Sequence, residues 1–336
     1  YWKVKVWDVS GLESDWSPVA WWRTGLFEEF DWEGEWVSSK FAELLPHRRY
    51  KSNRRVEHEN WFMEDSAAVY MRREVEIPVP VRKATAFICG LGYYELYING
   101  RKVGDRVMDP LFTDYDKRVV YATYDVTDYF STGSNAFGIL LGNGWYSLPT
   151  RDVFGMHDAN WHTPPKVRLN VVVEYESGAR DVIVTDRTWN GEIVYNSVRS
   201  GETIDHTKSV HGWNEPGFCD SLWRNVCHVP APLGKLTAVP MPPMRVAKEL
   251  KPVGITETGP GVYLVDFGEN LTGWVETRVR GSRGQTVELQ FNEVLKADGS
   301  LDTQNSTWHT RGRYQTELLI LGGDGEETFE PRFTYH

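Results

Sequence analysis

The sequence predicts an all-β protein made of tandem β-sandwiches, and three observations lead to this fold class. Apolar and polar residues alternate with a period of two along most of the chain, as in strands with one buried face. The alternating runs are short, and glycine and proline turns separate them, as in antiparallel sandwiches. Helical periodicity is scarce, because its best example, residues 39–45, is short and stops at Pro46.

The expected strands begin at the first residue. In residues 1–7, Val4 and Val6 share one face of the strand, and Lys3 and Lys5 share the other. The same alternation predicts further strands, which lie at 67–77, 84–89, 118–125, 136–141, 166–175, 181–185, 192–196, 261–266, 273–281, 285–291 and 314–321.

Residues 94–103 give the clearest local signal, which is that of a β-hairpin. Alternating strand residues at 94–98 and 101–103 flank the dipeptide Asn99-Gly100. This dipeptide suits the two positive-φ positions of a type I′ turn, whose twist matches that of the two flanking strands.

The segment from Pro230 to Pro243 contains five prolines and predicts a linker. Proline cannot donate a backbone hydrogen bond, so such a segment makes a poor central strand. We therefore expect a domain boundary here, with a first sandwich at 67–235 and a second sandwich at 236–336.

The composition limits the classes of function. The 336 residues suffice for roughly two domains, or three small ones. The formal net charge is −10, whereas nucleic-acid-binding proteins usually carry a basic face, so we expect no nucleic-acid partner. No apolar stretch approaches the ~18 residues of a membrane span, so we expect no membrane partner. Three cysteines without paired spacing argue against a disulfide framework or a zinc site.

The aromatic content of 13% favours a sugar-binding surface. After the expected strand at 136–141, Asn143, Trp145 and Tyr146 put an amide and two rings at the rim of a sheet. An amide hydrogen-bonds hydroxyl groups, and a ring covers the apolar C–H groups of a sugar. Trp161 lies in a long loop, a kind of connection that often has a function. The alternative is that Trp145 fills the core and Asn143 holds a turn.

Acidic residues suggest a calcium site. Asp105, Asp109, Asp114 and Asp116 fall within twelve residues, and calcium prefers several oxygen ligands. Their spacing is not that of an EF-hand, and Asp114 and Asp116 could instead cap backbone amides before the strand at 118–125.

Two other groups of residues are weaker candidates for a functional site. Glu202 and Asp205 form a carboxylate pair after a glycine and are candidates for binding a sugar, although Asp205 could simply hold an Asx turn. His157, Asp158 and His162 could bind a metal, but their spacing fits no standard zinc site.

Motifs in order along the chain resemble those of the bacterial α-L-rhamnosidases. The first residues are similar to the end of a fibronectin-like module, and Trp32 with Trp36 resembles the family's linker into the next sandwich. The resemblance covers nearly the whole chain. The matching segments are 90–100 (GLGYYELYING), 103–105, 109–110, 113–118, 124–127, 141–146 (LGNGWY), 200–202 with Asp205, 212–214, 221–223, 266–270 with 273–274, 292–295 with 298–301, and 330–336 (EPRFTYH).

The resemblance implies the arrangement of the chain and its activity. Residues 1–26 correspond to the C-terminal strands of a fibronectin-like module and 27–66 to a linker, followed by two jelly-roll or concanavalin-like sandwiches. The family hydrolyses terminal α-L-rhamnosides with inversion, using two carboxyl groups in an (α/α)6 barrel downstream of the second sandwich. We therefore expect this chain to be a fragment without catalytic residues. Its expected partners are the barrel of the longer protein and a rhamnose-containing oligosaccharide or glycoside.

Some members of the family use the first sandwich as a calcium-dependent rhamnose-binding module, with an Asp-Asn pair before the Tyr-Glu-Leu strand. This chain has Leu91-Gly92 at that place, and neither residue supplies a side-chain oxygen. Asp105, Asn143 or Glu202 could supply it instead. The alternative function is therefore a stand-alone carbohydrate-binding module for rhamnose-containing glycans, and a purely structural interaction surface is a third possibility.

Overall fold

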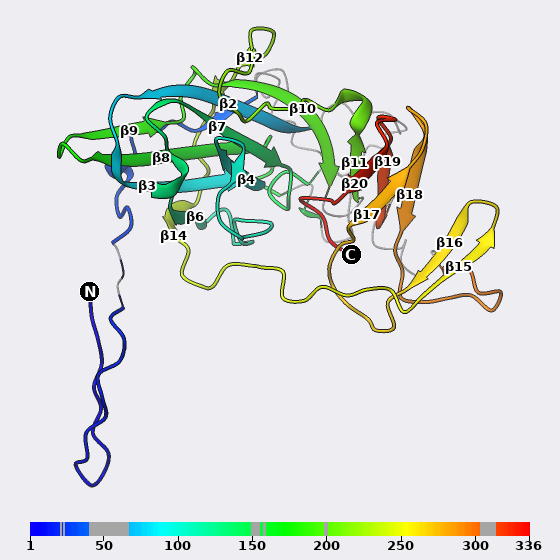
Figure 1. The fold of residues 1–336 in the computed structure, drawn as a ribbon, viewed down its shortest axis with the longest axis horizontal. Helices are drawn as coiled ribbons and strands as arrows, with labels where there is room; N and C mark the ends of the chain where they lie inside the picture. The colour runs from blue at the N-terminus through cyan, green and yellow to red at the C-terminus, as the bar shows by residue number, and fades with distance from the viewer. Residues whose placement is uncertain are drawn as a thin grey trace.

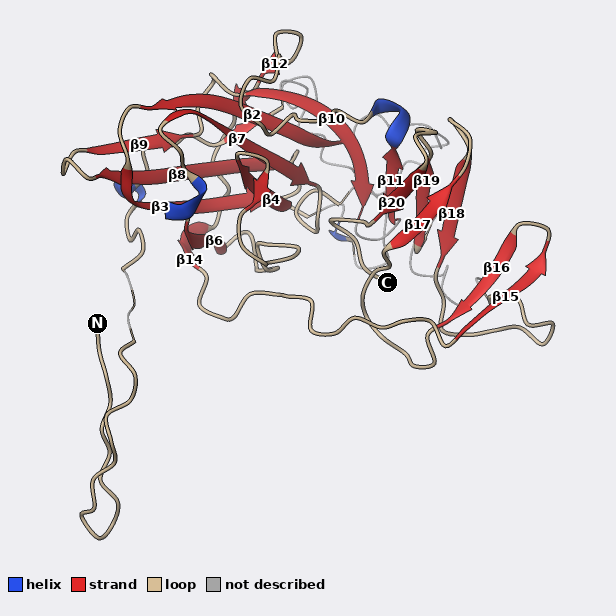
Figure 2. Ribbon diagram, in the orientation of Figure 1, coloured by secondary structure: helices blue, strands red, loops and turns tan. Residues whose placement is uncertain are grey.

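The computed structural model consists almost entirely of strands and loops (Figure 2). The part of the chain that it describes contains no α-helix, but it includes the short 3-10 helices η1 (Glu29–Asp31), η3 (Thr127–Tyr129) and η5 (His206–Lys208). The all-β prediction is therefore confirmed, while the helix expected at 39–45 lies outside the described residues except for Ser39. The described residues are 1–20, 22, 24–39, 67–148, 155–156, 159–197, 201–302 and 314–336.

Residues 1–20 extend away from the sheets as a thin two-stranded ribbon (Figure 1). Isolated bridges join Trp2 to Ala20 and Trp7 to Glu13, so the regular strand expected at 1–7 is wrong. The physical reason is a lack of burial, since Trp7 is 61% exposed and no third strand of the described residues covers the ribbon. Two strands alone are marginally stable in water.

The first of the two large sheets has seven strands in the order β13-β1-β8-β3-β6-β14, with β9 also paired to β8. The strands predicted at 118–125 and 166–175 are confirmed with the same bounds. The strands of this sheet are β1 (Val37–Ser38), β3 (Val81–Leu91), β6 (Arg118–Asp125), β8 (Lys166–Tyr175), β9 (Arg180–Val184), β13 (Cys227–His228) and β14 (Lys235–Ala238).

The second large sheet has nine strands in the order β18-β19-β11-β10-β2-β7-β4-β5, with β12 also paired to β10. The predicted strand at 67–77 is confirmed as β2. The strands of this sheet are β2 (Ala67–Ile77), β4 (Tyr93–Ile98), β5 (Arg101–Lys102), β7 (Gly133–Gly142), β10 (Asn190–Ser197), β11 (Gly201–Asp205), β12 (Arg224–Asn225), β18 (Thr286–Gln290) and β19 (Thr316–Ile320).

The main hydrophobic core lies between these two sheets, as in a sandwich. Ala86 and Ile88 of β3 enter it from one sheet, and Ile139 and Leu141 of β7 enter it from the other. The alternate residues of β3 are buried too, because Phe87 and its outward neighbours pack in a second cluster on the outer face. Segments before β1 and around β14 cover that outer face.

The predicted hairpin is confirmed by β4 and β5. Asn99 and Gly100 have φ angles of 52° and 77°, both in the left-handed region that a type I′ turn requires. The Asn99 side chain donates to the Tyr129 carbonyl and accepts from the Ala136 amide, which holds the turn against β7.

The nine-stranded sheet runs without a break from the first sandwich into the C-terminal part of the chain. β11 pairs in parallel with β19, with Thr203 opposite Leu318 and Asp205 opposite Ile320. β14, which includes residues beyond the expected boundary at 235, pairs in parallel with β6 at the edge of the other sheet.

The C-terminal part has a smaller core of its own. Leu319, Leu321 and Phe329 are buried together between β19 and its neighbours. The sheet β15-β16 is exposed on both faces, with Ile255 63% exposed on one face and Val262 58% exposed on the other. The remaining strands form two two-stranded sheets, β15 (Gly254–Gly259) with β16 (Val262–Asp266) and β17 (Thr277–Arg280) with β20 (Glu326–Phe329). Among the described residues, no helix has the length and apolarity needed to cross a membrane.

Candidate functional site

Three of the candidate sugar-binding residues lie in the turn that follows β7, close to the bend between β3 and β4. Gly92 lies in that bend, and a Cβ built on it would be 1.8 Å from the carbonyl oxygen of Asn143. This close backbone approach requires glycine. A side-chain ligand at position 92 is therefore impossible unless the turn moves.

Asn143 and Tyr146 are buried in this turn. The Asn143 carbonyl accepts a hydrogen bond of 3.0 Å from the amide of Ser147. The Tyr146 hydroxyl accepts one of 3.1 Å from Thr163, and its ring packs edge-on against Tyr115 with centroids 5.2 Å apart. Both residues therefore stabilise the turn and the outer core, and the Tyr146 ring is only 2% exposed.

Trp145 and Trp161 are half-buried and leave part of their rings accessible. Trp145 packs edge-on against Phe112, which is 47% exposed, with centroids 6.3 Å apart. Trp161 lies 5.7 Å from the ring of Tyr115. The two tryptophans therefore line an aromatic rim around Tyr115.

Three polar atoms at this rim are buried without a hydrogen-bond partner among the described residues. They are the Tyr115 hydroxyl, Oδ1 of Asp116 and the indole nitrogen of Trp161. A buried polar group without a partner costs about 1–3 kcal/mol, and such groups usually bind ordered water or a ligand. We refer to Tyr115, Asp116, Trp145, Tyr146 and Trp161 as the rim site.

A lysine lies beneath the rim site. The ammonium group of Lys166 is buried, 5.8 Å from the Tyr146 ring, and donates to the carbonyl of Pro230 at 2.9 Å. Burial lowers the pKa of Lys166 to about 8, because the charged form loses its hydration.

The four aspartates of the predicted calcium site do not come together. Asp105 pairs with Arg245 at 2.6 Å, Asp114 pairs with Lys117 at 2.8 Å, and Asp109 is buried and accepts from the Tyr94 hydroxyl at 2.9 Å. Hydrogen bonds from Arg245 and Lys117 lower the pKa of Asp105 and Asp114, whereas burial raises that of Asp109. Within the described ranges, no three His, Cys, Asp or Glu side chains group as metal ligands.

The weaker histidine candidates give no metal site in the described part either. His157 and Asp158 lie outside the described residues. His162 is described, and its Nε2 is hydrogen-bonded to the carbonyl of Leu148 at 2.9 Å.

Glu202 and Asp205 lie on β11, away from the rim site. Asp205 caps η5 by accepting from the Thr207 amide at 3.0 Å, so it forms the Asx-type turn that was the alternative. Glu202 is 3% exposed and accepts from the amides of Arg332 and Phe333 at 2.8 and 2.9 Å. Burial and the neighbouring Glu317 raise the pKa of Glu202 to about 8.

Glu317 of β19 lies beside Glu202 and helps to connect the first sandwich to the C-terminal part of the chain. One carboxylate oxygen accepts from the Glu202 amide, and the other is hydrogen-bonded to Nε2 of His336. The His336 ring stacks on Phe291 with centroids 4.2 Å apart. Sequence reasoning missed Glu317, because a single charged residue in an alternating strand carries no signal that it faces inward.

The family models match most of the chain. Residues 79–248, about half of it, match the α-L-rhamnosidase N-terminal domain, and residues 256–336 match the bacterial α-L-rhamnosidase concanavalin-like domain. The chain belongs to the α-L-rhamnosidase family. Residues 1–28 match a Rha78A-like N-terminal immunoglobulin domain, which has the kind of architecture expected for a fibronectin-like module.

Curated α-L-rhamnosidases are similar along the whole chain. The relative from Formosa agariphila is 33% identical over all of this chain and 36% of its own length. The relative from Streptomyces avermitilis is 35% identical over 98% of this chain and 31% of its own length. The chain therefore spans about a third of the length of these relatives.

Solved α-L-rhamnosidase structures share the fold. That from Dictyoglumus thermophilum has a TM-score of 0.82 at 35% identity, over 99% of this chain and 36% of its own. The structure from Aspergillus terreus has a TM-score of 0.86 at 28% identity, and the match covers 99% of this chain and 37% of that structure's chain. The Streptomyces avermitilis enzyme, solved in complex with L-rhamnose, has a TM-score of 0.75 at 38% identity. The match covers 81% of this chain and 26% of that structure's chain.

Proposed function

We propose that this chain is the accessory β-sandwich portion of an α-L-rhamnosidase that hydrolyses terminal α-L-rhamnosides with inversion. The observation that carries the proposal is the 33% identity to a curated α-L-rhamnosidase over the whole chain. We keep the proposed division into a module end at 1–26, a linker at 27–66, a first sandwich at 67–235 and a second sandwich at 236–336.

Chemistry supports a non-catalytic role for the described residues. An inverting glycosidase needs an acid and a base on opposite sides of the sugar, about 6.5–9.5 Å apart with room for a water molecule. Glu202 and Glu317 are neighbouring buried carboxylates, but their oxygens bind backbone amides and His336. We therefore assign the catalytic pair to a barrel in the longer protein, which the two sandwiches support.

The stereochemistry of the reaction tests the mechanistic part of this proposal. NMR of the first turnovers of an aryl α-L-rhamnoside by the longer protein should show β-L-rhamnose as the initial product. An initial α-anomer would contradict inversion.

The unpartnered polar atoms of the rim site favour a second function, carbohydrate binding by the first sandwich. The ligand we propose is the rhamnosyl end of a glycan, with its apolar face on Trp145 or Trp161 and its hydroxyls on Asp116 and Tyr115. Calorimetry with L-rhamnose at millimolar concentration, with and without calcium, tests it. Binding that Trp161→Phe weakens would support it, and no heat under either condition would count against it.

A further inference from the structure

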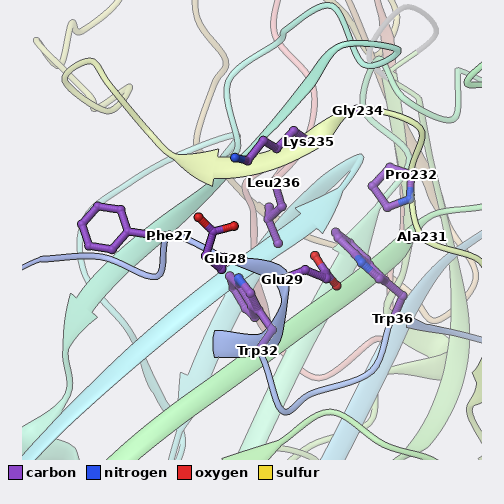
Figure 3. Close-up of a pocket in the computed structure, with 10 residues that line it drawn as sticks. All are labelled: Phe27, Glu28, Glu29, Trp32, Trp36, Ala231, Pro232, Gly234, Lys235 and Leu236. Atoms are coloured by element: carbon purple, nitrogen blue, oxygen red, sulfur yellow. The ribbon is translucent and has the colours of Figure 1, made fainter.

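A pocket of about 160 Å³ lies on the outer face of the seven-stranded sheet, between the segment before β1 and the segment that leads into β14 (Figure 3). It is separate from the residues of the rim site. Its size is below the roughly 300–1,000 Å³ of pockets for drug-sized ligands, so it suits one small ring. The pocket is lined by Phe27, Glu28, Glu29, Trp32, Trp36, Ala231, Pro232, Gly234, Lys235 and Leu236.

Buried polar side chains fix the first wall of this pocket, which consists of residues 26–36. Arg168 of β8 is 7% exposed, donates to the Gly34 carbonyl at 2.6 Å and forms an ion pair with Glu29. Asn170 accepts from the Gly34 amide at 2.8 Å, and the Tyr121 hydroxyl donates to the Leu26 carbonyl at 2.8 Å. The wall is therefore held in place before any ligand arrives, which lowers the entropy cost of binding.

The second wall is fixed by backbone pairing. The amide of Lys235 donates to the Lys117 carbonyl at 3.0 Å, and β14 continues the pairing along β6. Gly234 lies so close to this strand that a Cβ on it would be 2.5 Å from the Arg118 amide nitrogen. The position of Lys235 and Leu236 opposite the tryptophans is thus set by the sheet.

The lining combines rings with exposed charged groups of both signs. Phe27 is 66% exposed at the mouth, and Trp32 and Trp36 are nearly buried, with Glu29 between them in Figure 3. Arg168 binds Oε1 of Glu29, whose side chain is 72% exposed, which leaves Oε2 for solvent or a ligand. Lys235 is exposed as well, so its ammonium group is also accessible to a ligand.

We propose that this pocket binds one neutral pyranose ring of a glycan. The apolar face of the ring would lie on Phe27, while sugar hydroxyls donate to Glu29 and accept from Lys235. A neutral polyol satisfies a carboxylate and an ammonium group together, whereas an anionic sugar would meet Glu28 and Glu29. The proposal goes beyond the accessory role above, and rhamnoside turnover by the longer protein does not depend on it.

Titration calorimetry of the protein with methyl α-L-rhamnopyranoside, methyl β-D-galactopyranoside and D-glucuronate tests the proposal. We expect at least one neutral pyranoside to bind with a millimolar Kd, and D-glucuronate to bind more weakly. Glu29→Gln and Phe27→Ala should each weaken binding by about tenfold, because they remove a charged acceptor and an exposed ring. Lys235→Met should weaken it several-fold.

Glu276→Gln is the matched control, because Glu276 is an exposed carboxylate paired with Arg278 near another sheet. It should leave binding unchanged, and unfolding curves that match the unsubstituted protein would show that the variants are folded. Failure of both neutral pyranosides to bind overturns the proposal. Binding that persists in the three pocket variants also overturns it. A loss of sugar binding confined to Trp161→Phe would assign the sugar to the rim site instead.

Discussion

Replacing Glu202 with glutamine tests how the two parts of the chain are joined. In the native protein Glu202 is buried beside Glu317, and its pKa is raised from the ordinary 4.5 to about 8. The folded state therefore holds a proton that the unfolded state releases between these two pH values. The stability that this proton contributes is complete below pH 4.5 and is lost as the pH rises through about 8.

The size of the effect follows from the structure. A pKa difference between 4.5 and about 8 corresponds to at most about 5 kcal/mol of unfolding free energy. Glutamine cannot ionise, but its NH2 group would face the amide of either Arg332 or Phe333, which costs about 1–3 kcal/mol. The wild-type protein should thus be more stable than Glu202→Gln at pH 5, and the difference should vanish or reverse at pH 8.

Denaturant unfolding at pH 5, 6, 7 and 8 measures this difference, and amide hydrogen exchange of residues 330–336 reports the same change locally. Asp205→Asn is the control on the same strand. Hydrogen bonds from Thr207 and Lys208 lower the pKa of Asp205, so its contribution should stay constant over this pH range. A constant stability difference between wild type and Glu202→Gln from pH 5 to 8 would show that Glu202 is not protonated preferentially in the folded state.

Two further substitutions test the turn and the charge near the rim site. Lys166→Met should raise the unfolding free energy by about 1–2 kcal/mol below pH 8. The gain should fade from about pH 8 to 10.5, because the folded wild-type protein loses the Lys166 proton at a lower pH than the unfolded chain does. A gain that does not change with pH would contradict the lowered pKa of Lys166. Gly92→Ala should lower the unfolding free energy by about 1–3 kcal/mol or more, because the new methyl group meets the Asn143 carbonyl at 1.8 Å. Gly254→Ala, which meets nothing within 4 Å, should change it by less than about 0.5 kcal/mol, and equal effects of the two substitutions would be evidence against the close approach.

Local pattern was enough to predict much of the fold. Alternation gave the bounds of β6 and β8, and Asn99-Gly100 gave the hairpin, because both signals lie within a few neighbouring residues. The parallel pairing of β11 with β19 joins residues more than a hundred positions apart, and no local pattern encodes it. β14 was hidden between Pro232 and Pro240, where its proline-free residues form an edge strand.

The candidate site was harder to predict than the fold, because a residue type does not show which way its side chain faces. Trp145 and Trp161 lie at the rim as half-buried rings, whereas Tyr146 and Asn143 are buried. Glu202 was selected as a carboxylate, but it binds two backbone amides of the C-terminal segment. Its role depends on Glu317 and Arg332, which are distant in the sequence.

The proposed role of these sandwiches is to support rhamnoside hydrolysis without performing it. Its most direct test is the release of nitrophenol from p-nitrophenyl α-L-rhamnopyranoside, measured for the 336-residue chain and for the longer protein at equal concentration. We expect turnover by the longer protein and none above background by the 336-residue chain. Turnover by the purified 336-residue chain would contradict it.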